Sequence, residues 1–311
     1  MASTLGTTTT PPIAPVAPEV TTKGRGRRAG PYPYWFYIPA AVIYTVLFLV
    51  PTISGWYYSF TRWDLFTSTW IGLKNYKTFF AEQALIIGLR NTLIYATMTS
   101  SLKVVIGMLL AVLLTAKIVA RGYLRSVIFF PVLVSTIGVG LTFTVLMDPE
   151  RGLINKALGV IGITGPDWLV NPKIAIFSIA LVDVWQGVGL ATVIFIAGIV
   201  SIPSDYFEAA EVDGATRFYS FLHITLPLAR PAITTVITLS LIGGLRSFDL
   251  IWAMTGGGPG FASDTIASVI YKQYQAGFYG LSTAGSVVLF LLVSAIIVPL
   301  TWWLNRHEVE R

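Results

Sequence analysis

Long apolar runs, separated by short polar segments, dominate the chain. A helix needs about 20 mostly apolar residues to cross the hydrocarbon core of a bilayer. Six runs are long enough, at residues 35–60, 87–116, 124–147, 174–200, 231–254 and 280–304. This pattern predicts an all-α integral membrane protein with six transmembrane helices.

The composition agrees with a bilayer protein and removes several kinds of chemistry. Of the 311 residues, 54% are hydrophobic and 12% are charged, whereas soluble domains carry about 25% charged residues. The mean hydropathy is +0.72. The absence of cysteine excludes disulfides and thiolate catalysis. The two histidines, His223 and His307, lie outside the predicted spans, so we expect no histidine metal site. Without a basic patch interleaved with aromatic residues, we expect no nucleic-acid partner.

The distribution of basic residues predicts the orientation. Six spans place both termini on one side, and that side carries eleven of the 21 Lys and Arg residues against eight on the other. Because cytoplasmic loops are enriched in Lys and Arg, we expect both termini in the cytoplasm. Residues 1–33 form a low-complexity tail that we expect to be disordered, and residues 306–311 form a short C-terminal tail. The first run is too long for the apolar region of a signal peptide, so we expect it to remain as an uncleaved span.

The longest cytoplasmic connection is the loop 201–230. Ser204 or Asp205 is expected to cap the start of a helix and Gly214 to end it. Thr216 is expected to cap a second short helix, and Pro227 limits its continuation into the fifth span. The loop has too many apolar residues for a segment that only faces water. Composition leaves two interpretations open: a surface that docks a partner protein, or a loop folded onto its own helical bundle or into the lipid headgroups.

The strings Glu208-Ala209-Ala210, Asp213-Gly214-Ala215 and Ile224-x-Leu226-Pro227 resemble the EAA motif. This motif is the cytoplasmic signature of permease subunits in binding-protein-dependent ABC importers. The resemblance implies the type I importer permease fold and a coupling helix that fits into a cleft of a cytoplasmic ATPase. The implied docking residues are Glu208, Ala209, Ala210, Asp213, Gly214 and Pro227.

The same resemblance implies partners and a location. The partners would be a second EAA-loop permease, two ABC ATPase subunits and an extracytoplasmic sugar-binding protein or lipoprotein, in contact with membrane lipid. The chain has no GxxxxGK[ST] string, so ATP and Mg are expected on the ATPase subunits and no cofactor on this chain. We therefore expect a non-catalytic subunit in a bacterial cytoplasmic membrane.

Three further segments resemble the carbohydrate-uptake branch of that family, the maltose and glycerol-3-phosphate permease type. They are Ile71-Gly72-Leu73-x-Asn75-Tyr76, Asn91-Thr92-Leu93 and the string SFDLIWAMTGGGP at residues 247–259. The implied substrate is a mono- or oligosaccharide, with a sugar phosphate as the alternative.

Polar residues within membrane spans are costly and mark functional candidates. Gln186, Arg246 and Asp249 are candidates for hydrogen bonds to sugar hydroxyls, and Arg246 and Asp249 are spaced to pair on one helix face. The aromatic candidates for contact with sugar rings are Trp185, Phe248 and Trp252. In the alternative, Lys103 and Asp183 form a buried pair that holds two helices together, and the tryptophans face lipid.

Two other classes of function compete with the importer. A secondary transporter would work alone on an ion gradient and usually needs broken helices at its own coupling sites. A membrane glycosyltransferase or scaffold should carry acidic residues on a large outside loop, and only Asp148 and Glu150 lie close together there.

Overall fold

A computed structural model describes residues 34–116 and 118–306. The predicted disordered tail 1–33, Lys117 and the terminal residues 307–311 lie outside the described residues. The chain divides into two units, residues 1–50 and 51–311. In the first unit, a 3₁₀ turn (Tyr34–Tyr37), α1 (Ile38–Tyr44) and a π-helical turn (Thr45–Leu49) follow one another.

The second unit begins with α2 (Val50–Ser59, whose first residue closes the first unit) and a hairpin of β1 (Thr61–Trp63) and β2 (Ser68–Trp70). These two antiparallel strands are a small addition to the predicted all-helical fold. Asp64 shapes the turn, because its carboxylate accepts hydrogen bonds from the backbone N–H groups of Phe66 and Thr67 and from the Thr67 hydroxyl. These bonds, led by the backbone N–H of Thr67, hold the pKa of Asp64 below its usual value of 3.8.

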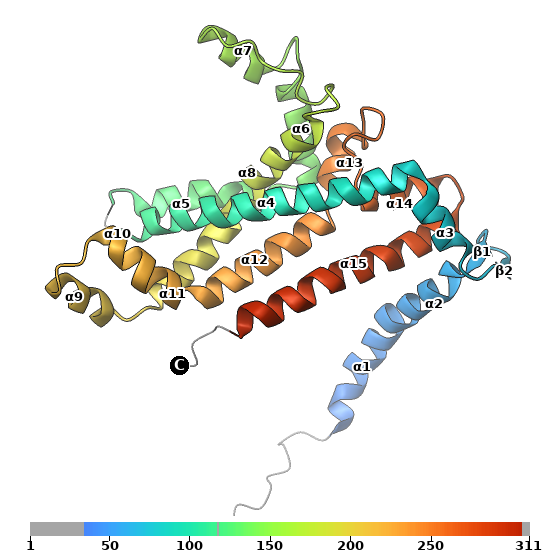
Figure 1. Cartoon of the computed structure of the whole chain (residues 1–311), viewed down its shortest axis with the longest axis horizontal. Coiled ribbons are helices and arrows are strands. Elements are labelled where there is room, and N and C mark those ends of the chain that lie inside the picture. The colour runs from blue at the N-terminus through green and yellow to red at the C-terminus, as the bar shows by residue number, and fades with distance from the viewer. Residues whose placement is uncertain (1–33, 117, 307–311) are drawn as a thin grey trace, which may run out of the picture. The chain divides into compact units, whose positions relative to one another are not determined.

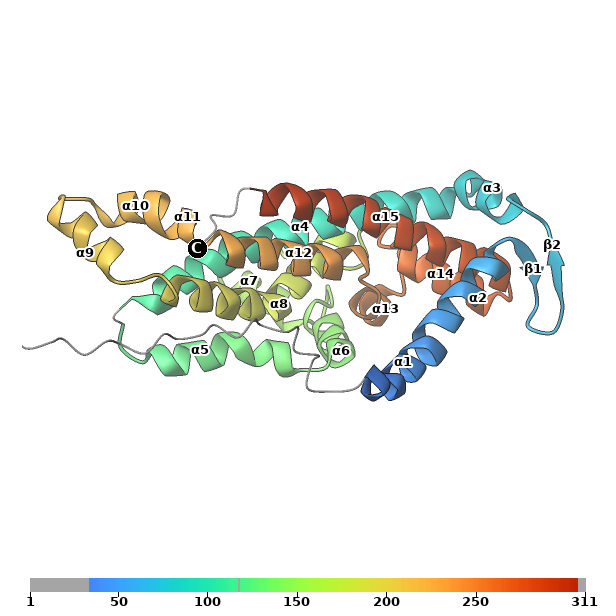
Figure 2. The ribbon, with the colours of Figure 1, turned by 90° about the horizontal axis from the view of Figure 1, so that it is seen from below.

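Long helices form the body of this unit. After α3 (Lys74–Ala81) come α4 (Gln83–Thr115) and α8 (Ala175–Val200), and later α12 (Arg230–Leu245) and α15 (Tyr279–Asn305). The runs form helices because a helix satisfies all its backbone hydrogen bonds without water. Figures 1 and 2 show α4 beside α8 and α12, and α15 beside α12.

Small residues allow these helices to approach closely. A Cβ atom on Gly107 of α4 would lie 3.0 Å from the Cβ of Ala191 in α8. A Cβ atom on Gly244 of α12 would lie 2.7 Å from the Cα of Ala96 in α4. In a bilayer, where no hydrophobic effect drives helices together, such close packing is a main source of association.

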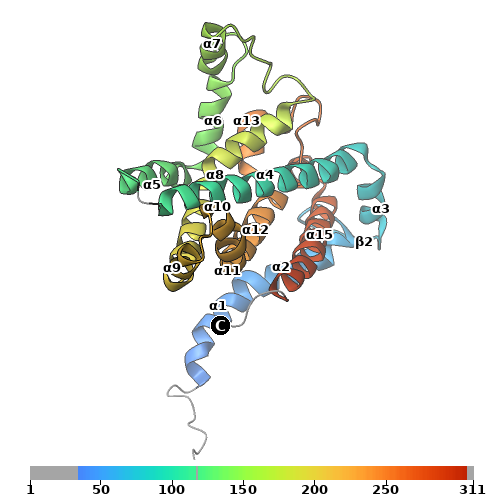
Figure 3. The same cartoon turned by 60° about the vertical axis from the view of Figure 1, so that its left-hand side comes forward.

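The third predicted span, 124–147, is not one helix. It consists of α5 (Arg121–Phe129), a 3₁₀ turn (Phe130–Leu133) and α6 (Thr136–Leu146), with a bend of 97°. Pro131 lies in the first turn of the 3₁₀ segment, where its missing N–H costs nothing. Figure 3 shows α6 leading away from α4 and α12 toward α7 (Leu153–Val160).

The fifth predicted span, 231–254, is also interrupted. Helix α12 ends at Leu245 and α13 (Asp249–Thr255) begins after three residues, followed by α14 (Ile266–Gln275). The predicted first, second, fourth and sixth spans coincide with single long helical stretches. Within the described residues, four helices are long and apolar enough to cross a membrane. The number is six if each of two bent pairs counts as one span, the pairs being Arg121–Leu133 with Thr136–Leu146 and Arg217–Leu228 with Arg230–Leu245.

Candidate functional site

The loop 201–230 contains two short helical segments, at the end of the second unit opposite the hairpin (Figure 1). The first is α9 (Asp205–Val212), with Asp205 and Glu208 in its first turn, where negative charge suits the helix dipole. The predicted cap at Ser204 is wrong. Ser204 precedes the helix in a helical conformation, and its side chain makes no capping hydrogen bond.

A glycine turn ends α9 as predicted. Gly214 has φ +73°, the left-handed conformation that glycine adopts without steric cost. Its N–H donates to the carbonyl of Glu211 at 3.1 Å, and the N–H of Ala215 donates to the carbonyl of Ala210 at 2.8 Å. These two bonds define a Schellman motif, which fixes the direction of the chain after the helix.

The second helical segment begins at Thr216, whose hydroxyl accepts from the N–H of Tyr219 at 3.2 Å. It comprises α10 (Arg217–Ser220), a π-helical turn (Phe221–Thr225) and α11 (Leu226–Leu228). Pro227 lies within this segment and does not stop it. The bend comes at Ala229, where the segment meets α12 at 69°.

The loop has an exposed outer side and an inner side that faces the ends of α4 and α8, so part of it folds onto its own bundle, while partner docking on the outer side stays a prediction. On the outer side, Glu208, Ala209, Asp213 and Gly214 are exposed. Ala210 and Pro227, the other two predicted docking residues, are half-buried. The exposed group contains large apolar side chains as well, namely Tyr206, Val212 and Phe218.

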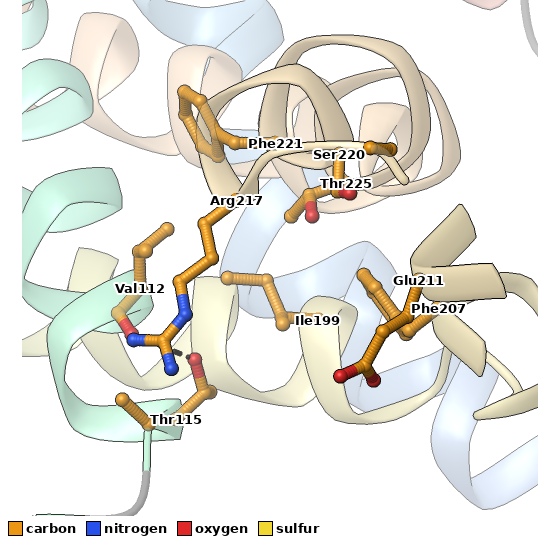
Figure 4. Close-up of a pocket in the computed structure, with 11 residues that line it drawn as sticks. Val112, Thr115, Ile199, Phe207, Glu211, Arg217, Ser220, Phe221 and Thr225 are labelled. Atoms are coloured by element: carbon orange, nitrogen blue, oxygen red, sulfur yellow. Dashed lines mark hydrogen bonds between the residues drawn. The ribbon is translucent and has the colours of Figure 1, made fainter. Parts of the chain in front are cut away.

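The inner side faces a cavity of about 490 Å³ between the loop and the ends of α4 and α8. Figure 4 shows Phe221 near Arg217, and Phe207 near Glu211. The Arg217 guanidinium lies beside Thr115, and the Glu211 carboxylate lies across the cavity from it. No ion pair joins Glu211 to Arg217 among the residues the structure describes, so the cavity keeps a charge of each sign on opposite walls.

Lys103 of α4 and Asp183 of α8 form an ion pair, with 2.8 Å between Nζ and Oδ2. The lysine side chain retains 11% of its surface and the aspartate 22%. Gly187, one turn after Asp183, makes room for the lysine, because a Cβ there would lie 2.6 Å from Lys103 Cε. The arrangement matches the structural alternative, a pair that holds two helices together.

Gln186 is buried and bound to protein. Its Nε2 donates to the carbonyl of Val134 at 3.0 Å and to the Thr136 hydroxyl at 3.4 Å. Val134 lies in the break between the 3₁₀ turn and α6, where the backbone lacks helical partners. Gln186 therefore joins α8 to the broken third span, and a bond from this amide to a sugar stays a prediction that the geometry does not favour.

Four of the five remaining path candidates, all but Trp185, lie at the break in the fifth span. Arg246 and Asp249 are exposed, but they do not share a helix, because the chain leaves the helical path between Leu245 and Asp249. The predicted pairing of the two is therefore wrong; the ion pairs between described residues are Lys103–Asp183 and Asp264–Lys272.

Aromatic rings cluster beside this break. Phe248 stacks on Trp252 with ring centroids 5.6 Å apart, and Tyr271 of α14 contacts both rings at 5.2 and 4.9 Å. Trp185 lies elsewhere, on α8, with its ring 5.1 Å from that of Phe143.

Sequence reasoning missed the polar groups that hold the segment after α13. Asn91 of α4 donates to the carbonyls of Ala262 and Asp264 at 2.9 and 3.0 Å, and the Thr92 hydroxyl accepts from the N–H of Ile266 at 2.9 Å. The Asp264 carboxylate is fully buried and pairs with Lys272 at 2.7 Å. The sequence signal for this contact was the pair Asn91-Thr92, two adjacent polar residues inside an apolar run.

Within residues 34–116 and 118–306, no three His, Cys, Asp or Glu side chains come together as a metal site would require.

Comparison with known proteins agrees with this architecture. Residues 103–308 match the family model described as "Binding-protein-dependent transport system inner membrane component". The trehalose/maltose transport system permease protein MalF of Thermococcus litoralis is 32% identical over 85% of this chain and 90% of its own length. The arabinooligosaccharides transport system permease protein AraP of Bacillus subtilis is 33% identical, over 85% of this chain and 86% of its own.

Among solved structures, a bacterial ABC transporter that imports the acidic polysaccharide alginate shares the fold. Its matching chain has a TM-score of 0.76 at 21% identity, over 88% of this chain and 94% of that one. A bacterial alginate ABC transporter in complex with a periplasmic protein that holds an alginate pentasaccharide gives a TM-score of 0.71 at 21% identity, over 88% of this chain and 92% of that one. The chain belongs to the inner-membrane permease family of binding-protein-dependent ABC importers, a family of multi-pass, non-catalytic transporter subunits.

Proposed function

We propose that this permease carries a mono- or oligosaccharide across the membrane and that loop 201–230 couples its movement to ATP hydrolysis on a partner. The relatives support the substrate class, since they are named for trehalose/maltose, arabinooligosaccharides and multiple sugars. A sugar phosphate is the alternative substrate, with Arg246 as the exposed cation that would favour it.

The observation that carries the coupling proposal is the outer side of α9. Glu208 offers an exposed carboxylate for a basic group on the partner, and Ala209 beside it permits close approach. The Schellman motif at Gly214 makes α9 and the next segment a defined pair. A displacement of α9 then moves α12 through the second helical segment, which meets α12 at Ala229.

The assembly that follows has two ABC ATPase subunits, which bind ATP and Mg, and a second permease with its own EAA loop. An extracytoplasmic sugar-binding protein or lipoprotein delivers the substrate. The complex of an alginate transporter with its periplasmic protein supports a partner of this last kind.

Charge reversal at Glu208 tests the coupling. Glu208→Lys and Gly214→Pro should abolish sugar uptake by the assembled transporter, while the chain still inserts and the ATPase subunits still hydrolyse ATP. Glu150→Lys is the matched control, because it reverses an exposed carboxylate in a connection that is predicted to lie on the extracytoplasmic side of the membrane. Normal uptake by both loop variants would overturn the coupling proposal.

Uptake measurements also distinguish the importer hypothesis from the secondary-transporter hypothesis. Uptake into proteoliposomes should require the ATPase subunits and ATP. Uptake by this chain alone, driven by an ion gradient, would support the secondary transporter instead.

A further inference from the structure

Six aromatic rings from five elements of the second unit contact one another in sequence. Successive ring centroids lie between 4.1 and 6.5 Å apart. We call this set the aromatic ladder; its rings are Trp252, Tyr271, Tyr274, Tyr279, Trp63 and Tyr58.

The ladder leads from the break in the fifth span to the hairpin. Trp252 lies on α13, the next rings lie on α14 and α15, and Trp63 lies on β1. Figures 1 and 2 both place the hairpin at the end of the unit opposite α9, with α13 nearer its middle and α14 between them. A belt of interfacial aromatics would stay at one depth, whereas this set extends along the molecule.

The rings are open to a ligand. Tyr271 is 37% exposed and Tyr274 51%, and Trp252, Tyr279 and Trp63 are partly exposed. Tyrosine and tryptophan each combine a flat apolar face with a polar tip. A pyranose ring has the complementary form, with C–H groups on its faces and hydroxyls around its edge.

At the hairpin end, Trp63 lines a cavity of about 530 Å³ between β1, α3 and the start of α15. This volume lies within the range of about 300–1,000 Å³ found for ligand pockets. The polar side chains that line it include Arg62, Asp64, Lys74 and Gln273. Charged and amide groups around an aromatic ring suit hydroxyl-rich ligands.

We propose that the aromatic ladder is a track for an oligosaccharide, which enters at the Trp63 cavity and passes ring by ring to Trp252 at the break of the fifth span. The inference rests on the proposed sugar-transport function and makes it more specific: the substrate is a chain of several sugar units. Successive rings at such separations can hold neighbouring units at once, which a single sugar would not need. Arg246 and Asp249, exposed near the inner end, would then meet the hydroxyls of the leading unit.

The test uses cells that express the complete transporter, with uptake of glucose- and arabinose-based disaccharides and pentasaccharides. Tyr274→Leu removes one exposed ring and keeps an apolar side chain. We expect it to lower pentasaccharide uptake about tenfold and disaccharide uptake less than about threefold, because a longer chain contacts more rings. Tyr274→Phe keeps the ring and should stay within about twofold of wild type for both lengths.

Phe66→Leu is the matched control, because Phe66 is 94% exposed at the hairpin turn and lies outside the ladder. It should leave both rates unchanged. Tyr271→Leu repeats the test at the neighbouring ring if the first variant does not assemble.

Three outcomes would overturn the proposal that the ladder is an oligosaccharide track: equal losses for both lengths, unchanged pentasaccharide uptake, or loss of assembly in both leucine variants. In each case the role of the rings would be to pack against lipid or a second permease. A wild-type transporter that takes up none of these sugars would instead overturn the proposed sugar function. The two failures are therefore distinguishable.

Discussion

Removal of the Lys103 charge tests whether the intramembrane ion pair is structural. In Lys103→Met the Asp183 carboxylate keeps its place between α4 and α8 but loses the ammonium group 2.8 Å away. Loss of one partner from a buried pair costs about 3–5 kcal/mol. Because Asp183 retains 22% of its side-chain surface, we expect the lower end, about 3 kcal/mol.

The double variant Lys103→Met/Asp183→Leu gives the sharper result. It removes both charges and fills the space with apolar groups, and such replacements are often neutral. We expect its unfolding free energy within about 1 kcal/mol of wild type, so that the two substitutions are strongly non-additive.

The unfolding free energy is measured by denaturant unfolding of the detergent-solubilised transporter, and transport by the same variants is measured as uptake into proteoliposomes. Lys173→Met is the matched control, because Lys173 is an exposed lysine just before α8; we expect a change within about 0.5 kcal/mol. A Lys103→Met variant as stable as wild type, or a double variant as unstable as the sum of both singles, would refute the structural role. Loss of transport at full stability would place the pair in the translocation path instead.

Two further expectations follow from single side chains. Gln186→Leu should destabilise the protein by about 1–3 kcal/mol, because it leaves the Val134 carbonyl in the broken third span without its donor; thermal unfolding measures this, and altered sugar specificity at unchanged stability would favour substrate contact instead. In the hairpin, the depressed pKa of Asp64 means that its contribution to stability is complete above the unfolded pKa and is lost as the pH falls through the lower folded value; NMR titration of the Asp64 carboxyl should give a pKa below 3.8, and an ordinary value would contradict the hydrogen bonds of the turn.

The regular part of the fold could be predicted because its causes are local. An apolar run such as 174–200 becomes α8 whatever surrounds it, since a helix is how a single segment satisfies its backbone in lipid. The turn at Gly214 was predictable for the same reason, because left-handed backbone favours glycine.

The breaks and the site geometry could not be predicted because their causes lie far away in the sequence. The break at 134–135 depends on Gln186, about 50 residues later. The segment after α13 is held by Asn91, about 170 residues earlier. The predicted pairing of Arg246 with Asp249 required one continuous helix through both residues. Because α12 ends at Leu245, the two residues do not share a helix face. Tyr271 and Tyr274 belong to α14, in what the apolar pattern indicated to be an outside connection.

One stretch of chain joins the proposed docking surface to the proposed sugar track. From Glu208 the backbone passes the Schellman motif at Gly214, bends at Ala229 and follows α12 to Leu245, after which α13 carries Trp252. Helix α12 packs against α4 at Gly244 too closely for a side chain, so the two helices must shift together or separate. In the proposed coupling, a displacement of α9 would reach the inner end of the aromatic ladder through helices, and the angle between segments would change at the 69° bend and at the short break after Leu245.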